Sequence, residues 1–171
     1  ISKADVELRL QELKALTETA TRLGFTIALH ENYTDYYAPP PKGAGPGYDD
    51  FVETDIALDK DSQWLPAWPG SFAAKPTAIL GLAETQSPKI KERYKTNACF
   101  LDVHSALPPW VYVDARAEET GAKTFRARWE ANRALWQYER DIYSGPVLGE
   151  GHSHWYYSGL LDGVEAQFGE G

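Results

Sequence analysis

The apolar residues near the start of the chain recur every three or four positions, the spacing of one face of a helix. Ser2 and Asp5 stand just before this pattern and have the form of a capping box. Gly24 stands where a glycine commonly ends a helix. The pattern therefore predicts a helix between Ser2 and Gly24, with an apolar face made by Val6, Leu10, Leu13, Leu16, Ala20 and Leu23.

Two later stretches show the same helical spacing. The first spans residues 77–94, and we expect a break near Ser87 and Pro88, because proline lacks an amide donor and disfavours helical backbone before it. The second spans roughly residues 124–141, ends at Gly145-Pro146, and places on one face Phe125, Trp129, Asn132 and Trp136. We expect the run Glu139-Arg140-Asp141 on this helix to face solvent.

Short apolar runs alternate with these helices and predict buried strands over residues 25–29, 98–101, 147–150 and 163–168. The order is α-β-α-β-α-β and then β, which is typical of a parallel sheet with right-handed crossovers. Polar clusters follow three successive strands, at residues 30–35, 102–104 and 150–155. Carboxylates at the ends of adjacent strands favour a (β/α)8 barrel over a doubly wound sheet.

Four strands make about half of such a barrel. We therefore expect an α/β fold, a partial (β/α)8 (TIM) barrel with about four parallel strands, formed by residues 1–171 as one catalytic domain truncated at both ends. Its partner would be the remainder of the parent barrel. As a hypothesis, the fragment alone is inactive and poorly soluble, because an opened barrel has two unpaired strand edges.

Residues 38–72 are rich in proline and glycine and read as one long connection. Connections of this length inside a compact domain are typically functional lids or binding loops. We expect this βα loop to lie over the site, and the alternative is an insertion without a role.

The overall composition excludes some partners. A net charge of −8 argues against nucleic acid, and no apolar run is long enough to span a membrane. The single cysteine, Cys99, lies inside an apolar run and reads as a buried core residue without a disulfide partner. Aromatic residues make up 13% of the chain, which suggests a carbohydrate substrate, since sugar faces stack on aromatic rings. We expect a secreted or periplasmic protein rather than a cytoplasmic one.

Two carboxylates at neighbouring strand ends, Asp102 and Glu150, are the minimum equipment of a glycosidase. Adjacent strands lie about 5 Å apart, which suits the short carboxyl separation of a retaining, double-displacement mechanism. The glycines and aromatic residues around Glu150 favour a raised pKa. We therefore predict Asp102 as nucleophile and Glu150 as acid/base, with no cofactor and no metal.

Residues 97–104 (NACFLDVH) and 145–151 (GPVLGEG) resemble the catalytic-barrel core of bacterial glycoside hydrolases of family 129 and the related family 101. The resemblance implies a retaining enzyme that releases α-linked N-acetylgalactosamine from mucin-type glycans. In that pattern the nucleophile is an Asp ending one strand and the acid/base is a Glu ending the next, which are Asp102 and Glu150 here. The motifs support an α-glycosidase-like barrel better than any one sugar.

The remaining candidates for substrate binding are polar or aromatic residues near the predicted strand ends: His30, Asn32, Asp35, His104, Trp110, His152 and Trp155. Two alternatives stay open. Asp102 with His104, and His152 with His154, are pairs at i and i+2 that could each bind a metal ion in an amidohydrolase-type barrel. A non-catalytic carbohydrate-binding relic would keep the aromatic residues and make the acids incidental.

Overall fold

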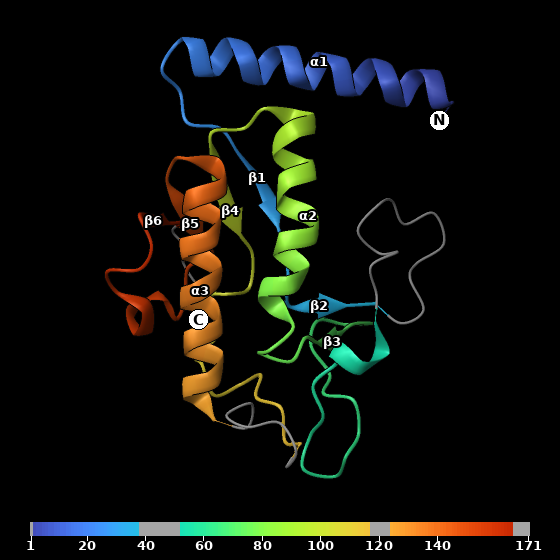
Figure 1. Cartoon of the computed structure of the whole chain (residues 1–171), viewed down its shortest axis with the longest axis vertical. Helices are drawn as coiled ribbons and strands as arrows, with labels where there is room; N and C mark the ends of the chain where they lie inside the picture. The colour runs from blue at the N-terminus through green and yellow to red at the C-terminus, as the bar shows by residue number, and fades with distance from the viewer. Residues whose placement is uncertain (1, 38–51, 117–123, 166–171) are drawn as a thin grey trace, which may run out of the picture.

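The computed structural model describes residues 2–37, 52–116 and 124–165. Four parallel strands form one sheet in the order β1-β4-β5-β6 (Figure 1). The strands and helices are, in chain order, α1 (Lys3–Arg22), β1 (Ala28–Glu31), β2 (Asp35–Tyr36), η1 (Glu53–Asp55), β3 (Phe72–Ala73), α2 (Ile79–Tyr94), β4 (Ala98–Leu101), α3 (Phe125–Tyr143), β5 (Val147–Gly149), η2 (His154–Tyr157) and β6 (Gly163–Val164). The predicted partial (β/α)8 barrel is confirmed.

Helices α2 and α3 pack side by side on one face of the sheet (Figure 1). Strand register places Cys99, Leu101 and Val147 on this covered face, where each is fully buried. Their neighbours His30, Phe100 and Leu148 lie on the opposite face, where they are half-buried or exposed. In a closed barrel that second face lines the interior.

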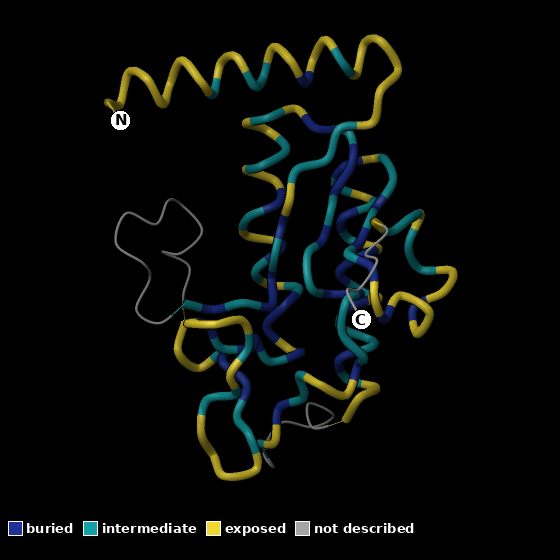
Figure 2. Tube along the Cα trace, turned by 180° about the vertical axis from the view of Figure 1, so that it is seen from behind, coloured by how far each residue is buried: buried dark blue, intermediate teal, exposed yellow. Residues whose placement is uncertain are grey.

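Helix α1 has the predicted capping box, in which the Ser2 hydroxyl accepts the Asp5 amide at 3.1 Å. Its apolar face is not buried: Val6, Leu16 and Leu23 are 47–64% exposed, and only Thr17 is fully enclosed. The helix lies across the end of the molecule near the start of β1 (Figures 1 and 2). The described residues therefore cover little of the apolar face of α1. None of the helices in the described ranges has the length and apolar character to cross a bilayer.

The predicted break in the second helix is wrong, because α2 runs without interruption through Pro88. A proline inside a helix costs about 3 kcal/mol. Packing of α2 against α3 and the sheet compensates, together with the buried hydroxyl of Ser87, which donates to Glu139 at 2.6 Å. Tertiary contacts thus outweigh the local preference.

The first strand begins later than the apolar run predicts. Asn97 ties residues 25–27 in an irregular conformation, accepting the Ile27 amide at 2.8 Å and donating to the Phe25 carbonyl at 3.1 Å. Strand β1 therefore includes His30 and Glu31. The shift places the Glu31 side chain under the helices, where it is 4% exposed.

The predicted loop at 38–72 has regular structure in its second half, while residues 38–51 lie outside the described part. Strands β2 and β3 pair antiparallel, and isolated bridges join Ile56 to Ala74 and Pro66 to Phe72. This small β-structure stands at the C-terminal end of the parallel strands (Figure 1). For the predicted fourth strand at 163–168, β6 covers its first two residues, and residues 166–168 lie outside the described part.

Candidate active site

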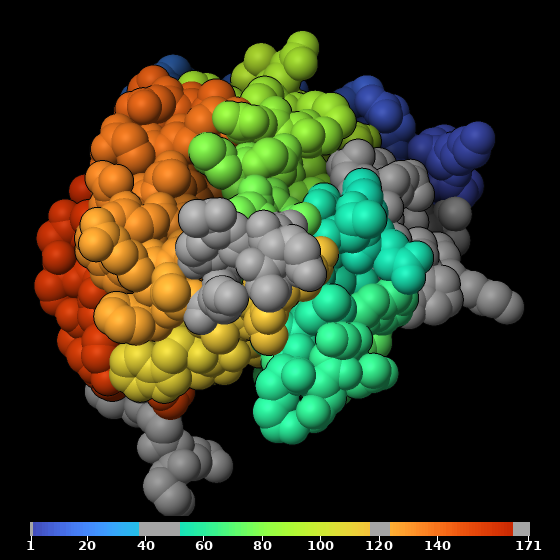
Figure 3. All heavy atoms as spheres, turned by 60° about the horizontal axis from the view of Figure 1, so that its bottom comes forward, coloured from blue at the N-terminus to red at the C-terminus, as the bar shows by residue number. Residues whose placement is uncertain are grey.

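A cavity of about 780 Å³ opens at the C-terminal ends of β1, β4 and β5. Figure 3 views the molecule from this end, with the described part of the long connection in turquoise to green across from α3 in orange. Ala67 and Trp68, from the described part of the long βα connection, line the cavity. The polar and aromatic lining includes His30, Asn32, Asp35, Asp102, Glu150, Tyr36, Tyr37, Trp68 and Tyr112.

Asp102 directly follows β4 and Glu150 directly follows β5, and the last residues of these strands, Leu101 and Gly149, are paired. This register makes the two carboxyl groups neighbours, and burial together with the Glu150 carboxylate raises the pKa of Asp102. Glu150 also accepts the Val103 amide at 2.8 Å. The structure thus brings together the two predicted catalytic residues.

Backbone geometry fixes both carboxyl groups. Val103 has φ of 66°, an unfavourable value for a β-branched residue and a form of strain that clusters at active sites. At Gly149, an added Cβ would meet the Ser105 hydroxyl at 2.2 Å, so a larger residue next to Glu150 would displace that side chain. Ser105 in turn donates to the Glu150 carbonyl at 2.7 Å.

Two donors face the carboxylate of Asp102. His30 Nε2 lies 3.3 Å from Oδ1, and Asn32 Nδ2 donates to Oδ2 at 3.2 Å. Burial raises the pKa of Asp102 above its usual value, the charge of His30 lowers it, and the Glu150 carboxylate raises it again. Asp102 therefore holds its proton to higher pH than an isolated aspartate would.

Asn32 and Asp35 form a rigid polar wall beside this pair. The Asn32 side-chain carbonyl accepts the amides of Thr34 and Asp35, and its amide donates to Asp35 at 2.7 Å as well as to Asp102. Asp35 also accepts the Ser71 hydroxyl at 2.9 Å, which ties the wall to the long connection. The predicted His30, Asn32 and Asp35 thus all line this cavity.

His104 does not line the cavity. It is 1% exposed, with Nδ1 3.0 Å from Asn132 Oδ1 and Nε2 accepting the Tyr33 amide at 3.3 Å. Burial, followed by the nearby Arg128, lowers the pKa of His104 to about 3, so the ring is neutral. His104 hydrogen-bonds to the backbone of the cavity residue Tyr33, and it is not placed to touch substrate as predicted.

The predicted aromatic platforms, Trp110 and Trp155, also lie outside the cavity that Asp102 and Glu150 line. Trp110 is 53% exposed and packs edge-on against Tyr156 at 4.9 Å in a separate apolar groove on the surface, which Trp129 also lines. Trp155 is 59% exposed, and His152 is exposed as well. These three positions do not support direct contact with a sugar bound between Asp102 and Glu150.

Sequence patterns missed several residues that the fold brings to this region. Tyr33, Trp68 and Tyr112 line the cavity. The only sequence feature that pointed to these three residues was the general abundance of aromatic residues in loops. The prediction that Glu139 faces solvent is wrong: it is fully buried, because α3 turns it toward the sheet beside Ser87.

The Asp102–His104 pair, predicted in the alternative to bind one metal ion, offers no free histidine nitrogen. His104 is enclosed with both ring nitrogens engaged, whereas His152 and His154 are exposed. In the described part of the chain, the one group of three potential ligands is Glu31, Cys99 and Glu139, which contains no histidine. The residues that the amidohydrolase alternative needs are therefore not placed together.

No protein-family model and no curated protein sequence matches the chain. Two solved structures resemble it in fold. Ega3 of Aspergillus fumigatus, in complex with galactosamine, matches with a TM-score of 0.51 and 11% identity over 81% of this chain. TtGalA, an alpha-galactosidase from Thermus thermophilus in complex with stachyose, matches with a TM-score of 0.57 and 14% identity over 89% of this chain.

The chain spans 48% of Ega3 and 30% of TtGalA. At these identities the likeness concerns the fold alone. The chain has the α/β architecture of a partial (β/α)8 barrel, and it shares that architecture with barrel proteins that include a glycosidase.

Proposed function

We propose that this chain is part of a retaining glycoside hydrolase that acts on an α-linked sugar. The observation that carries the proposal is that Asp102 and Glu150 follow the paired residues Leu101 and Gly149 of neighbouring strands and line the same cavity. Inverting enzymes keep their carboxyl groups about 6.5–9.5 Å apart to admit a water molecule. Carboxyl groups at the ends of adjacent strands, about 5 Å apart, are closer to the short separation of retaining enzymes.

In the proposed mechanism, Asp102 attacks the anomeric carbon while Glu150 gives its proton to the leaving oxygen. The glycosidic bond breaks and a covalent glycosyl-Asp102 forms. Glu150, now ionised, takes a proton from water, which displaces Asp102 and restores the original anomeric configuration. Donors at His30 and Asn32 stabilise the ionised Asp102 before it attacks and after water releases it.

The lining of the cavity supports a neutral or cationic sugar. Its described lining residues include the carboxylates of Asp35, Asp102 and Glu150. They include no lysine or arginine. The galactosamine bound by Ega3 and the alpha-galactosidase activity named for TtGalA suggest a galacto-configured ring. We therefore propose α-N-acetylgalactosaminides and α-galactosaminides as first substrates, in line with the families 129 and 101 that the motifs resemble.

The test uses the full-length protein and a panel of aryl α- and β-glycosides, with azide added to two variants. Asp102→Ala should regain turnover as a β-glycosyl azide, because azide replaces the missing nucleophile and inverts the α-substrate. Glu150→Ala should instead yield an α-glycosyl azide, because azide attacks the glycosyl-Asp102 intermediate without needing base catalysis. These opposite products assign the two roles.

Matched variants at the histidines distinguish the alternatives. His152→Ala and His154→Ala should hydrolyse the best aryl glycoside at the wild-type rate. Loss of activity in these variants together with full activity of Glu150→Ala would contradict the two-carboxylate mechanism and favour the metal-dependent alternative. Sugar binding without hydrolysis of any member of the panel would favour the non-catalytic one.

The pH dependence of kcat/KM provides a separate prediction. The acidic limb reports ionisation of the nucleophile in the free enzyme, and burial places the pKa of Asp102 above its usual value. Glu150→Gln should move this limb to lower pH, because a neutral amide no longer raises the Asp102 pKa. His30→Gln should move it to higher pH, because the lowering charge is lost. An activated dinitrophenyl glycoside keeps the activity of both variants measurable. If the acidic limb of the kcat/KM profile does not move in either variant, Asp102 is not the group that it reports.

The charge of the substrate provides a further prediction. Because carboxylates dominate the cavity, an α-galactosaminide with a free ammonium group should have a lower KM than the matched α-galacturonide. Asp35→Asn should narrow this difference, since it removes one negative charge beside the sugar. KM values for the two aryl substrates, measured at low and high salt, check the prediction. Equal KM values in the wild-type enzyme would count against it.

A further inference from the structure

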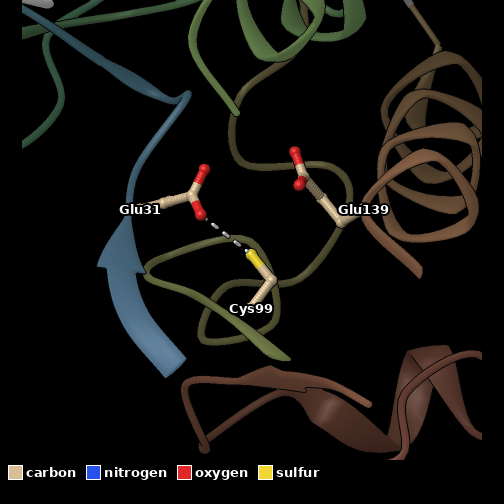
Figure 4. A group of neighbouring side chains, drawn as sticks. All are labelled: Glu31, Cys99 and Glu139. Carbon is tan, nitrogen blue, oxygen red and sulfur yellow. Dashed lines mark hydrogen bonds between the residues drawn. The ribbon is translucent and has the colours of Figure 1, made fainter. Parts of the chain in front are cut away.

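Three potential metal ligands converge in the layer between the sheet and the helices (Figure 4). Glu31 comes from β1, Cys99 from β4 and Glu139 from α3. One donor atom from each lies within 4.8 Å of the other two, and the Cys99 Sγ to Glu31 Oε1 distance is 3.5 Å. The three residues are 0–4% exposed, on the opposite side of the sheet from the catalytic pair.

Hydroxyl groups orient the carboxylates of this cluster. Tyr143 donates to Glu31 Oε1 at 2.6 Å, and Tyr33 donates to Glu31 Oε2. Ser87 donates to Glu139 Oε1 at 2.6 Å. Protein metal sites commonly have such an outer shell, in which ligating carboxylates are themselves hydrogen-bonded.

The negative charge of the carboxylates in this cluster is not balanced by a neighbouring cation in the described structure. Glu139 Oε2 is fully buried and has no hydrogen-bond partner, and the groups that perturb Glu139 in the described structure include the Glu31 carboxylate but no cation. A buried carboxylate pair must be neutralised by protons or by a bound cation. The Cys99 thiol also interacts with the Glu139 carboxylate, so sulfur and oxygen donors face the same point.

We propose that Glu31, Cys99 and Glu139 form a buried structural zinc site that fastens β1 and β4 to α3. Zn²⁺ is borderline-soft and accepts a cysteine thiolate together with carboxylate oxygens, at about 2.3 Å and 2.0–2.2 Å respectively. A tetrahedral ion with these bond lengths separates sulfur from oxygen by about 3.5 Å, which matches the observed spacing of Cys99 and Glu31. On binding, the thiol proton and any proton shared by the carboxyl groups leave to solvent.

Such a site would be structural and not catalytic, because the sheet on one side and the helices on the other exclude substrate. The hydroxyl groups of Ser87, Tyr33 and Tyr143, which contact these carboxylates, are neutral oxygen donors available for a fourth position. Since the site is enclosed, zinc would enter during folding. Refolding in the presence and absence of Zn²⁺ is therefore the appropriate way to load and empty it.

The test compares the full-length wild-type protein with Glu139→Gln and Cys99→Ser after refolding with Zn²⁺ and removal of excess metal. Metal analysis should find one equivalent of zinc fewer per chain in each variant than in wild type. Refolding with Co²⁺ should give the wild type a sulfur-to-cobalt charge-transfer band that is absent from Cys99→Ser. Tyr143→Phe should retain the band but bind the metal about 10–100-fold more weakly, because it removes an orienting hydrogen bond.

Equal zinc content in wild type and Glu139→Gln, with no charge-transfer band in the wild type, would overturn the proposal. That result would mean that a proton shared between the carboxyl groups neutralises the cluster. If Cys99→Ser fails to fold, the cobalt spectrum of the wild type decides by itself, since no other cysteine occurs in the 171 residues. The spectrum of Glu139→Gln is the control for any cysteine outside these residues, because this variant keeps every thiol and should lose only the band that depends on Glu139.

Discussion

Glu150→Gln is expected to lower kcat for a phenyl α-glycoside by about 10²–10⁴-fold, the usual contribution of general acid catalysis. The amide cannot donate a proton to the leaving oxygen, whereas its size preserves the contact with the Val103 amide. A dinitrophenyl glycoside needs little protonation of its leaving group. With that substrate, formation of the glycosyl intermediate should stay near the wild-type rate, and a burst of released phenol should precede slow turnover.

Steady-state and stopped-flow release of the phenol check this prediction. Glu92→Gln is the matched control, because it makes the same change at an exposed position on α2, away from the cavity. It should leave kcat unchanged for both substrates. An equal loss for the phenyl and dinitrophenyl glycosides would show that Glu150 is not the acid, and Asp102 would then need the same comparison.

Glu139→Gln is expected to remove a large pH dependence of stability from the metal-free protein. Burial and the neighbouring Glu31 raise the pKa of Glu139 from 4.5 to about 8. The folded state therefore keeps a proton that the unfolded state loses, so stability is full below pH 4.5 and falls as the pH rises toward 8. This shift corresponds to roughly 5 kcal/mol of free energy of unfolding.

Chemical denaturation in the presence of a chelator, at several pH values, measures this effect as the difference between wild type and variant. At low pH the two proteins should be similarly stable, because a protonated glutamate and a glutamine are nearly isosteric. Above pH 8 the variant should be the more stable one by up to that amount. Asp141→Asn, an exposed carboxylate on the same helix, should leave the curve unchanged. A difference that is constant with pH would contradict the prediction.

The alternation of periodic and continuous apolar segments was sufficient to predict the order of helices and strands. The cap at Ser2, the strand at residues 98–101 and the helix that became α3 were all predicted close to their observed bounds. The parallel pairing of β1, β4 and β5 followed from that order. Because parallel strands end at one edge of a sheet, the sequence also predicted that Asp102 and Glu150 lie together.

Local patterns misplaced residues whose environment depends on packing. Proline at position 88 predicts a break, yet contacts with α3 and the sheet keep α2 continuous. Glu139 belongs to a charged run and reads as exposed, yet the rotation of α3 turns it into the core. In each case long-range contacts supply more free energy than the local preference opposes.

The sequence by itself determined the fold class, the strand ends that hold the carboxyl pair and the burial of Cys99, because periodicity and strand order are local properties of the chain. Only the tertiary structure decided which polar residues face the cavity. It placed Asn32 and Asp35 beside Asp102, enclosed His104, and moved Trp110 to another surface. It also joined Glu31, Cys99 and Glu139, which come from three separate elements. Such placements depend on strand register and helix rotation, and residue spacing along the chain does not encode either one alone.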